Sequence, residues 1–176
     1  MVKQQFEFLN SVDHLTAAIK QTLHFIATSL PDNPAAKQTI FKAKVIITEL
    51  LTNSLKHSGT ANTLIDITVN EGELEIVKTD FGAPLNLNNA NNKAPVTNDV
   101  LHTLYAVQKS QNKIQFICEE NNLGKVIAID GIIEHFGLLI ITRAADNFTY
   151  IYEPETKANK FKATLKIDGD KAYKSL

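Results

Sequence analysis

The sequence has few of the residues that build disulfides, zinc sites or arginine clusters. Its 176 residues include one cysteine, Cys118, and no tryptophan. A single cysteine excludes an internal disulfide and a zinc site built from cysteines. Arg143 is the only arginine, so planar, two-pronged contact with a phosphate or carboxylate is available at one position at most. Base-composition bias in the genome is the plain explanation of this excess of lysine over arginine.

The charge balance and the short apolar runs exclude further classes of protein. Lysine and arginine number 18 against 19 aspartates and glutamates, a net charge of −1, whereas nucleic-acid-binding domains need a basic excess or patch. No apolar run approaches the roughly 20 residues that span a bilayer, and the polar N-terminal stretch predicts no secretory signal. We therefore expect a cytoplasmic protein without nucleic-acid or membrane partners. Its length predicts one domain over residues 1–176.

The apolar periodicity predicts a mixture of helices and strands. Helices are predicted at residues 11–26, 35–57, 96–107 and 137–145, and strands at 4–9, 63–69, 73–78, 113–120, 125–130, 148–153 and 161–167. Several of the strands are joined as hairpins, which favours an α+β fold. We expect a two-layer α/β sandwich, with helices on one face of a mixed, mostly antiparallel sheet. The asparagine-rich stretch at 85–93 has no period and predicts a loop.

One face of the second predicted helix carries three polar residues of different chemistry. At 100° per residue, Glu49, Asn53 and Lys56 fall on this face, opposite the apolar one. A carboxylate can orient or deprotonate a nucleophile, an amide oxygen is a hard ligand for Mg²⁺, and an ammonium neutralises a phosphate. The plain alternative is a solvated helix face with a polar pair four residues apart.

Two glycine-containing segments add to this pattern. Asp80 ends a predicted strand and could accept a hydrogen bond from an exocyclic amine, while Gly82 lets a ligand approach closely. Gly137 leads into a short apolar helix whose first amide groups suit a phosphate. Ordinary turn residues, and a core helix with a tight entry, are the alternatives. A protein-kinase interpretation of residues 80–82 fails because the other kinase motifs are absent.

Taken in order, the three segments resemble the GHKL superfamily, which groups gyrase, histidine kinases, mismatch-repair ATPases and anti-sigma-factor kinases. Residues 49–57 (ELLTNSLKH) are similar to its N box, 80–82 (DFG) to its first glycine box and 136–138 (FGL) to its second. The resemblance covers the whole chain and is closest to the stand-alone anti-sigma-factor serine kinases. It implies a Bergerat-type ATP-binding fold with an extended lid at about residues 85–134.

The resemblance implies an ATP-binding regulatory protein that uses ATP and Mg²⁺. Such a protein would act as a serine/threonine protein kinase in a partner-switching pathway. Its partners would be a sigma factor, an antagonist of the anti-sigma factor, or both, and a homodimer is expected. The site residues that the resemblance carries over are Glu49, Asn53, Lys56, His57, Asp80, Gly82, Gly137 and Leu138.

The implied roles follow the motifs. Glu49 would position or activate the nucleophile, and Asn53 would hold Mg²⁺ through the ATP phosphates. Lys56 would approach the phosphates, with His57 beside it as a further cofactor-binding residue. Asp80 would accept a hydrogen bond from the adenine amino group. In the glycine boxes, Gly82 would lie beside the ring, and Gly137 and Leu138 would offer backbone amides to the phosphates.

The sequence departs from the family pattern at two positions. Pro84 stands where the first glycine box continues with glycine, and His135 stands where the second box has a further glycine. Close approach of backbone to phosphate requires a missing side chain. The alternative prediction is therefore a catalytically degenerate module of the same fold, which binds a nucleotide or a partner without kinase activity.

Overall fold

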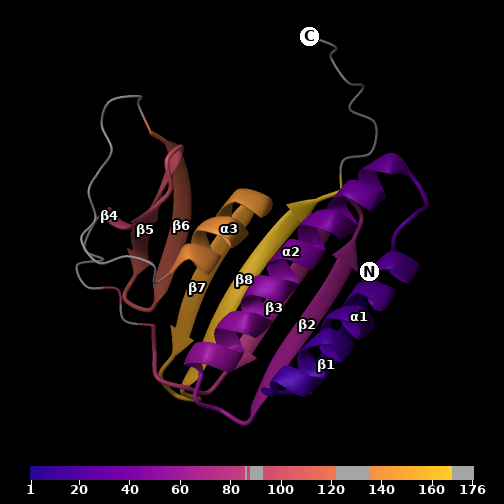
Figure 1. Cartoon of the computed structure of the whole chain (residues 1–176), viewed down its shortest axis with the longest axis horizontal. Helices are drawn as coiled ribbons and strands as arrows, with labels where there is room; N and C mark the ends of the chain where they lie inside the picture. The colour runs from indigo at the N-terminus through magenta and orange to yellow at the C-terminus, as the bar shows by residue number, and fades with distance from the viewer. Residues whose placement is uncertain (86, 88–92, 122–134, 168–176) are drawn as a thin grey trace.

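The computed structural model describes residues 1–85, 87, 93–121 and 135–167. Within them the chain forms three helices and eight strands (Figure 1). The elements are β1 (Val2–Leu9), α1 (Val12–Ser29), α2 (Pro34–His57), β2 (Asn62–Asn70), β3 (Glu73–Asp80), β4 (Ala94–Asn98), β5 (His102–Ser110), β6 (Lys113–Glu120), α3 (Phe136–Ala144), β7 (Asn147–Glu153) and β8 (Ala158–Lys166). None of the helices in this part of the chain is long and apolar enough to cross a bilayer.

The strands form one open sheet with the helices packed on one side of it (Figure 1). The order is β1-β2-β3-β8-β7-β6-β5-β4, and every pairing between these described strands is antiparallel. The predicted α+β class is thereby confirmed, with an antiparallel sheet in place of a mixed one. The last strand, β8, lies between β3 and β7, so the middle of the sheet joins distant parts of the sequence.

Helix α2 begins where its sequence supplies a cap. The Asn33 side chain accepts a hydrogen bond from the Ala36 amide at 2.8 Å, and Pro34 occupies the first turn, where its missing N–H costs no bond. Ile46, Ile47 and Leu50 are buried at helical spacing. This apolar stripe packs on the sheet and thereby sets the direction of the polar residues in the last two turns.

The inner face of β3 changes from apolar to charged along its length. Leu74 and Ile76 are fully buried on this face. Because side chains alternate along a strand, Lys78 and Asp80 follow them on the same side, and both are buried as well. The strand therefore carries two charged residues into the space beneath the helices.

The helix predicted over residues 96–107 is wrong, because this stretch forms β4 and β5. The Asp99 carboxylate accepts hydrogen bonds from the amides of Leu101 and His102 at 2.7 and 2.6 Å, which closes a turn between the two strands. Such local side-chain bonds favour turns over helix. The apolar residues also fit a helical spacing, and that coincidence misled the prediction.

The predicted lid at about residues 85–134 lies only partly within the described chain. Its described strands, β4 to β6, extend the main sheet. The strand predicted at 125–130 falls outside the described residues, as do residues 86 and 88–92 of the predicted loop. The other predicted elements are confirmed, with ends shifted by a few residues.

Candidate functional site

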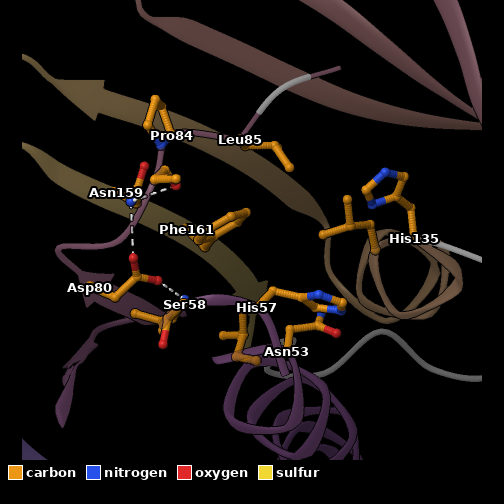
Figure 2. A pocket seen from close by; sticks show the side chains of 13 residues that line it. Asn53, His57, Ser58, Asp80, Pro84, Leu85, His135, Asn159 and Phe161 are labelled. Carbon is orange, nitrogen blue, oxygen red and sulfur yellow. Dashed lines mark hydrogen bonds and ion pairs between the residues drawn. The ribbon is translucent and has the colours of Figure 1, made fainter. Parts of the chain in front are cut away.

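A cavity of about 250 Å³ lies where α2 ends, α3 begins and β3 meets the start of β8 (Figure 2). Small-molecule sites usually measure about 300–1,000 Å³. This cavity is slightly smaller than that range and suits a group as small as a nucleobase. Its lining residues are Leu50, Asn53, His57, Ser58, Lys78, Asp80, Ala83, Pro84, Leu85, His135, Leu138, Asn159 and Phe161.

Asp80 is buried at one end of this cavity, with only 3 % of its surface exposed. Its carboxylate accepts hydrogen bonds from the Asn159 side chain at 2.9 Å and from the Gly82 amide at 3.1 Å. It also forms an ion pair with Lys78. The predicted acceptor therefore lies at the cavity wall, and three donors of the protein already bind it.

Lys78 is a buried cation beside Asp80. Its Nζ lies 4.8 Å from the centre of the Phe161 ring, close enough for a cation–π contact. Burial lowers the pKa of its ammonium, while the Asp80 charge and hydrogen bond act in the opposite direction. Lys78 was not predicted from the sequence, although the alternation of β3 places position 78 on the same face as the apolar positions 74 and 76.

Asn159 and Tyr150 hold the turn that follows β3. The Asn159 amide donates to the carbonyl oxygen of Gly82 at 3.0 Å. The Tyr150 hydroxyl donates to the Asn159 side chain at 2.7 Å and accepts from the Leu85 amide at 2.9 Å. Burial raises the pKa of the Tyr150 hydroxyl. No local pattern identifies this pair, because β8 and β7 meet the turn only in the folded chain.

Gly82 brings this turn against the end of α2. A Cβ atom at this position would lie 2.0 Å from the carbonyl oxygen of Ser58, a distance that no side chain tolerates. The backbone of the turn after β3 therefore reaches the end of α2 only because residue 82 lacks a side chain.

The start of α3 brings the second glycine segment to the same helix. A Cβ at Gly137 would lie 2.8 Å from Glu49 Oε2 and 3.0 Å from Asn53 Nδ2. These three predicted residues are therefore neighbours. The Leu138 amide donates to the carbonyl oxygen of His135 at 3.0 Å, so it is already bonded within the first turn. His135 itself adopts a left-handed backbone, with φ of 72°.

The two ends of the cavity differ in chemistry. Figure 2 shows Asn53, His57 and His135 toward one end and Asp80 and Asn159 toward the other. Lys56, on the last turn of α2, is exposed and does not line the cavity. Glu49 is not a lining residue either, and its carboxylate meets the α3 terminus.

The described residues contain no group of three histidine, cysteine, aspartate or glutamate side chains that could hold a metal ion. Mg²⁺ commonly keeps several waters and takes other ligands from substrate phosphates. Two side chains near Gly137, Asn53 and Glu49, carry oxygen atoms. Such oxygen ligands fit a Mg²⁺ ion that is bound to phosphate. Comparison with known proteins finds no family model that matches the chain and no match among curated proteins.

Proposed function

We propose that the chain is an ATP-binding regulatory protein of the GHKL type with a Bergerat-type fold. The observation that carries the proposal is that the three sequence segments 49–57, 80–82 and 136–138 meet around one cavity. The contact of Gly82 with the Ser58 carbonyl at the end of α2 requires glycine, which supports a backbone arranged for close approach. In this proposal the base lies toward Asp80 and the phosphates lie toward Asn53 and Gly137.

The proposed activity is that of an anti-sigma-factor-like serine/threonine kinase of the cytoplasm. The hydroxyl oxygen of a partner serine would bond to the terminal phosphorus of ATP, ADP would leave, and Glu49 would take the hydroxyl proton. Asn53 would hold Mg²⁺ through the phosphates, and Mg²⁺ would neutralise the charge of the phosphates. Phosphoryl transfer depends on such positioning and charge stabilisation. The proposed partners are a sigma factor or an antagonist protein, and the proposed assembly is a homodimer.

A binding module without phosphoryl transfer is the second candidate. Two observations favour it. Asp80 is already bound by Lys78 and Asn159, and His135 stands in a left-handed position that glycine adopts without strain. The bonds to Asp80 leave less of its capacity for a base, and the His135 side chain narrows the cavity, while the fold stays intact.

Thermal melts with nucleotide test the binding proposal. Ligand at a hundredfold excess over its dissociation constant stabilises the native state by about 2.7 kcal/mol. We expect ADP or ATP with Mg²⁺ to raise the melting temperature, and Asp80→Asn to reduce that rise. Melting curves that are identical with and without every nucleotide would overturn the proposal.

Transfer of label from ATP to an antagonist protein separates the two candidates. We expect the wild type to label a serine of the antagonist and Glu49→Gln to lose that labelling. Glu71→Gln, an exposed residue of the β2–β3 turn, is the matched control and should label as the wild type does. Nucleotide binding without any labelling would favour the module without transfer.

A further inference from the structure

We propose that Lys78 is a second base-recognition group of the cavity. Its ammonium donates a hydrogen bond to an acceptor atom of the bound heterocycle. That atom lies next to the N–H group of the heterocycle whose hydrogen bond Asp80 accepts. This inference rests on the proposed nucleotide site and specifies its ligand chemistry, a planar heterocycle with an acceptor beside a donor on one edge.

The first support is the unused hydrogen-bonding capacity of Lys78. An ammonium carries three N–H donors, and this side chain is only 4 % exposed. Asp80 is its sole hydrogen-bond acceptor among the residues that the structure describes. The Phe161 ring offers one further contact by its π face. Because buried donors are nearly always paired, a donor of Lys78 remains for an acceptor inside the cavity that Lys78 lines.

The second support is the remaining capacity of Asp80. A carboxylate offers about four acceptor positions, and three are taken by Lys78, Asn159 and Gly82. One acceptor position is left. Since Lys78 and Asp80 follow one another on the same face of β3, the cavity offers one donor beside one acceptor.

A purine edge is complementary to this pair. Adenine presents its amino group as donor beside the ring nitrogen N1 as acceptor. Hypoxanthine and guanine present N1–H as donor beside the carbonyl oxygen O6 as acceptor. Both edges are uncharged, as suits an end of the cavity where the Lys78 and Asp80 charges cancel. The two purine classes share the chemistry and are separated by the experiment.

The competing explanation is an internal ion pair in which Lys78 only neutralises the buried Asp80. This explanation predicts that ligand affinity does not depend on the atom facing Lys78. The inferred role predicts that it does, and an analogue lacking only that atom measures the difference.

The experiment is calorimetric titration of the full chain with ADP, IDP and 1-deaza-ADP, in which C–H replaces the N1 nitrogen. If ADP binds more tightly than IDP, we expect 1-deaza-ADP to bind about tenfold or more weakly than ADP, the loss typical of a hydrogen bond to a charged group. Lys78→Met should then bind the two adenine ligands equally. If IDP binds more tightly, Lys78→Met should weaken IDP binding about tenfold.

Lys160→Met is the matched control. Lys160 forms an ion pair with Glu153 at 2.7 Å, and neither residue lines the cavity. This variant should keep the wild-type affinities. If Lys78→Met fails to fold in a CD melt, the double variant Lys78→Met with Asp80→Asn removes both charges. Its ligand affinity should likewise not depend on the atom that faces position 78. The proposed role of Lys78 would be overturned if the Lys78 variant still discriminated between the ligands, or if the wild type bound all three equally. Either result would leave the proposed nucleotide site standing. Absence of all nucleotide binding would overturn the proposed function instead.

Discussion

Individual backbone positions decide how closely the segments around the cavity approach each other. Gly82 faces the Ser58 carbonyl at a distance that excludes a Cβ. Gly72 and Gly59, by contrast, have positive φ and open space around them. Gly82 on one side and Gly59 and Gly72 on the other therefore serve two separate needs, close packing at the cavity and left-handed backbone in turns.

Gly82→Ala should destabilise the protein and disrupt the cavity. Its Cβ would force the turn after β3 away from α2, and overpacking of this kind costs about 1–3 kcal/mol. Denaturant unfolding measures the loss, and ADP titration should show weaker binding. Gly72→Ala, which meets no atom within 4 Å, should cost about 1 kcal/mol from backbone strain alone and leave ADP affinity unchanged. Equal effects of the two variants on ligand affinity would contradict this interpretation.

His135→Gly should stabilise the fold by roughly 0.5–1 kcal/mol. The left-handed backbone of His135 costs a non-glycine residue about 1–2 kcal/mol, which exceeds the added chain entropy of glycine. Lys157→Gly is the matched control, since Lys157 is also left-handed, with φ of 57°, but does not line the cavity. Both variants should resist denaturant better than the wild type.

Only His135→Gly should also tighten ADP binding, because it removes a side chain from the cavity wall. Tighter binding by Lys157→Gly as well would show that affinity follows global stability.

At the scale of the elements, the turn between β4 and β5 is held by Asp99. Its carboxylate accepts from two backbone amides and lies 3.4 Å from Arg143 of α3. Burial alone would raise the pKa of Asp99, but these bonds and the nearby charges together lower it. The only arginine of the chain therefore links α3 to a turn of the sheet, away from the cavity.

Stability should fall in acid partly through Asp99. Because its pKa is lower in the folded state than the unfolded value of 3.8, its contribution is complete well above that value and is lost as the pH falls through the folded pKa. Asp99→Asn should lower the melting temperature by about 2–4 °C at neutral pH, as roughly 1 kcal/mol does in a chain of this size.

Between about pH 5 and pH 2, the melting temperature of Asp99→Asn should fall less steeply than that of the wild type. Asp32→Asn, at an exposed position of the α1–α2 loop, should keep the wild-type slope. Parallel curves for the wild type and Asp99→Asn would exclude this contribution.

The sequence predicted most elements that have a clear local period, but it did not predict the order in which the strands pair. α2 was predicted because its apolar stripe is long and because residues typical of helix starts and ends flank it. β4 and β5 were mistaken for a helix because short apolar spacings fit both structures. Asp80 was predicted as a ligand contact, whereas its partner Asn159 lies 79 positions further along the chain. That contact depends on strand order, which no local pattern encodes.

At the scale of the whole molecule, β8 joins the two halves of the sheet. It pairs with β3 on one side and with β7 on the other. A change in β8 should therefore affect the N-terminal and the C-terminal halves together. The cavity lies across the same junction, since its lining residues come from both halves.

Leu165→Ala should lower stability by about 2–5 kcal/mol, because Leu165 is fully buried in β8 and its loss leaves a void in the core. With no tryptophan in the chain, tyrosine fluorescence and far-UV CD are the probes, and both should report one coincident transition. Phe41→Ala, at a site that is 67 % exposed, should change stability by less than about 0.5 kcal/mol. Separate transitions by the two probes would contradict a single cooperative unit.

The late position of β8 in the chain also governs the order of events during synthesis. When the ribosome has released β3, its neighbour β2 has also been made, but its second neighbour β8 has not, because β8 is the last of the described strands in chain order. Until then β3 is an open edge of the kind that recruits other chains. The Lys78 and Asp80 pair lies on this edge strand throughout that interval. The cavity is complete only after β8 emerges, so a ligand can stabilise the finished protein but cannot assist the nascent one.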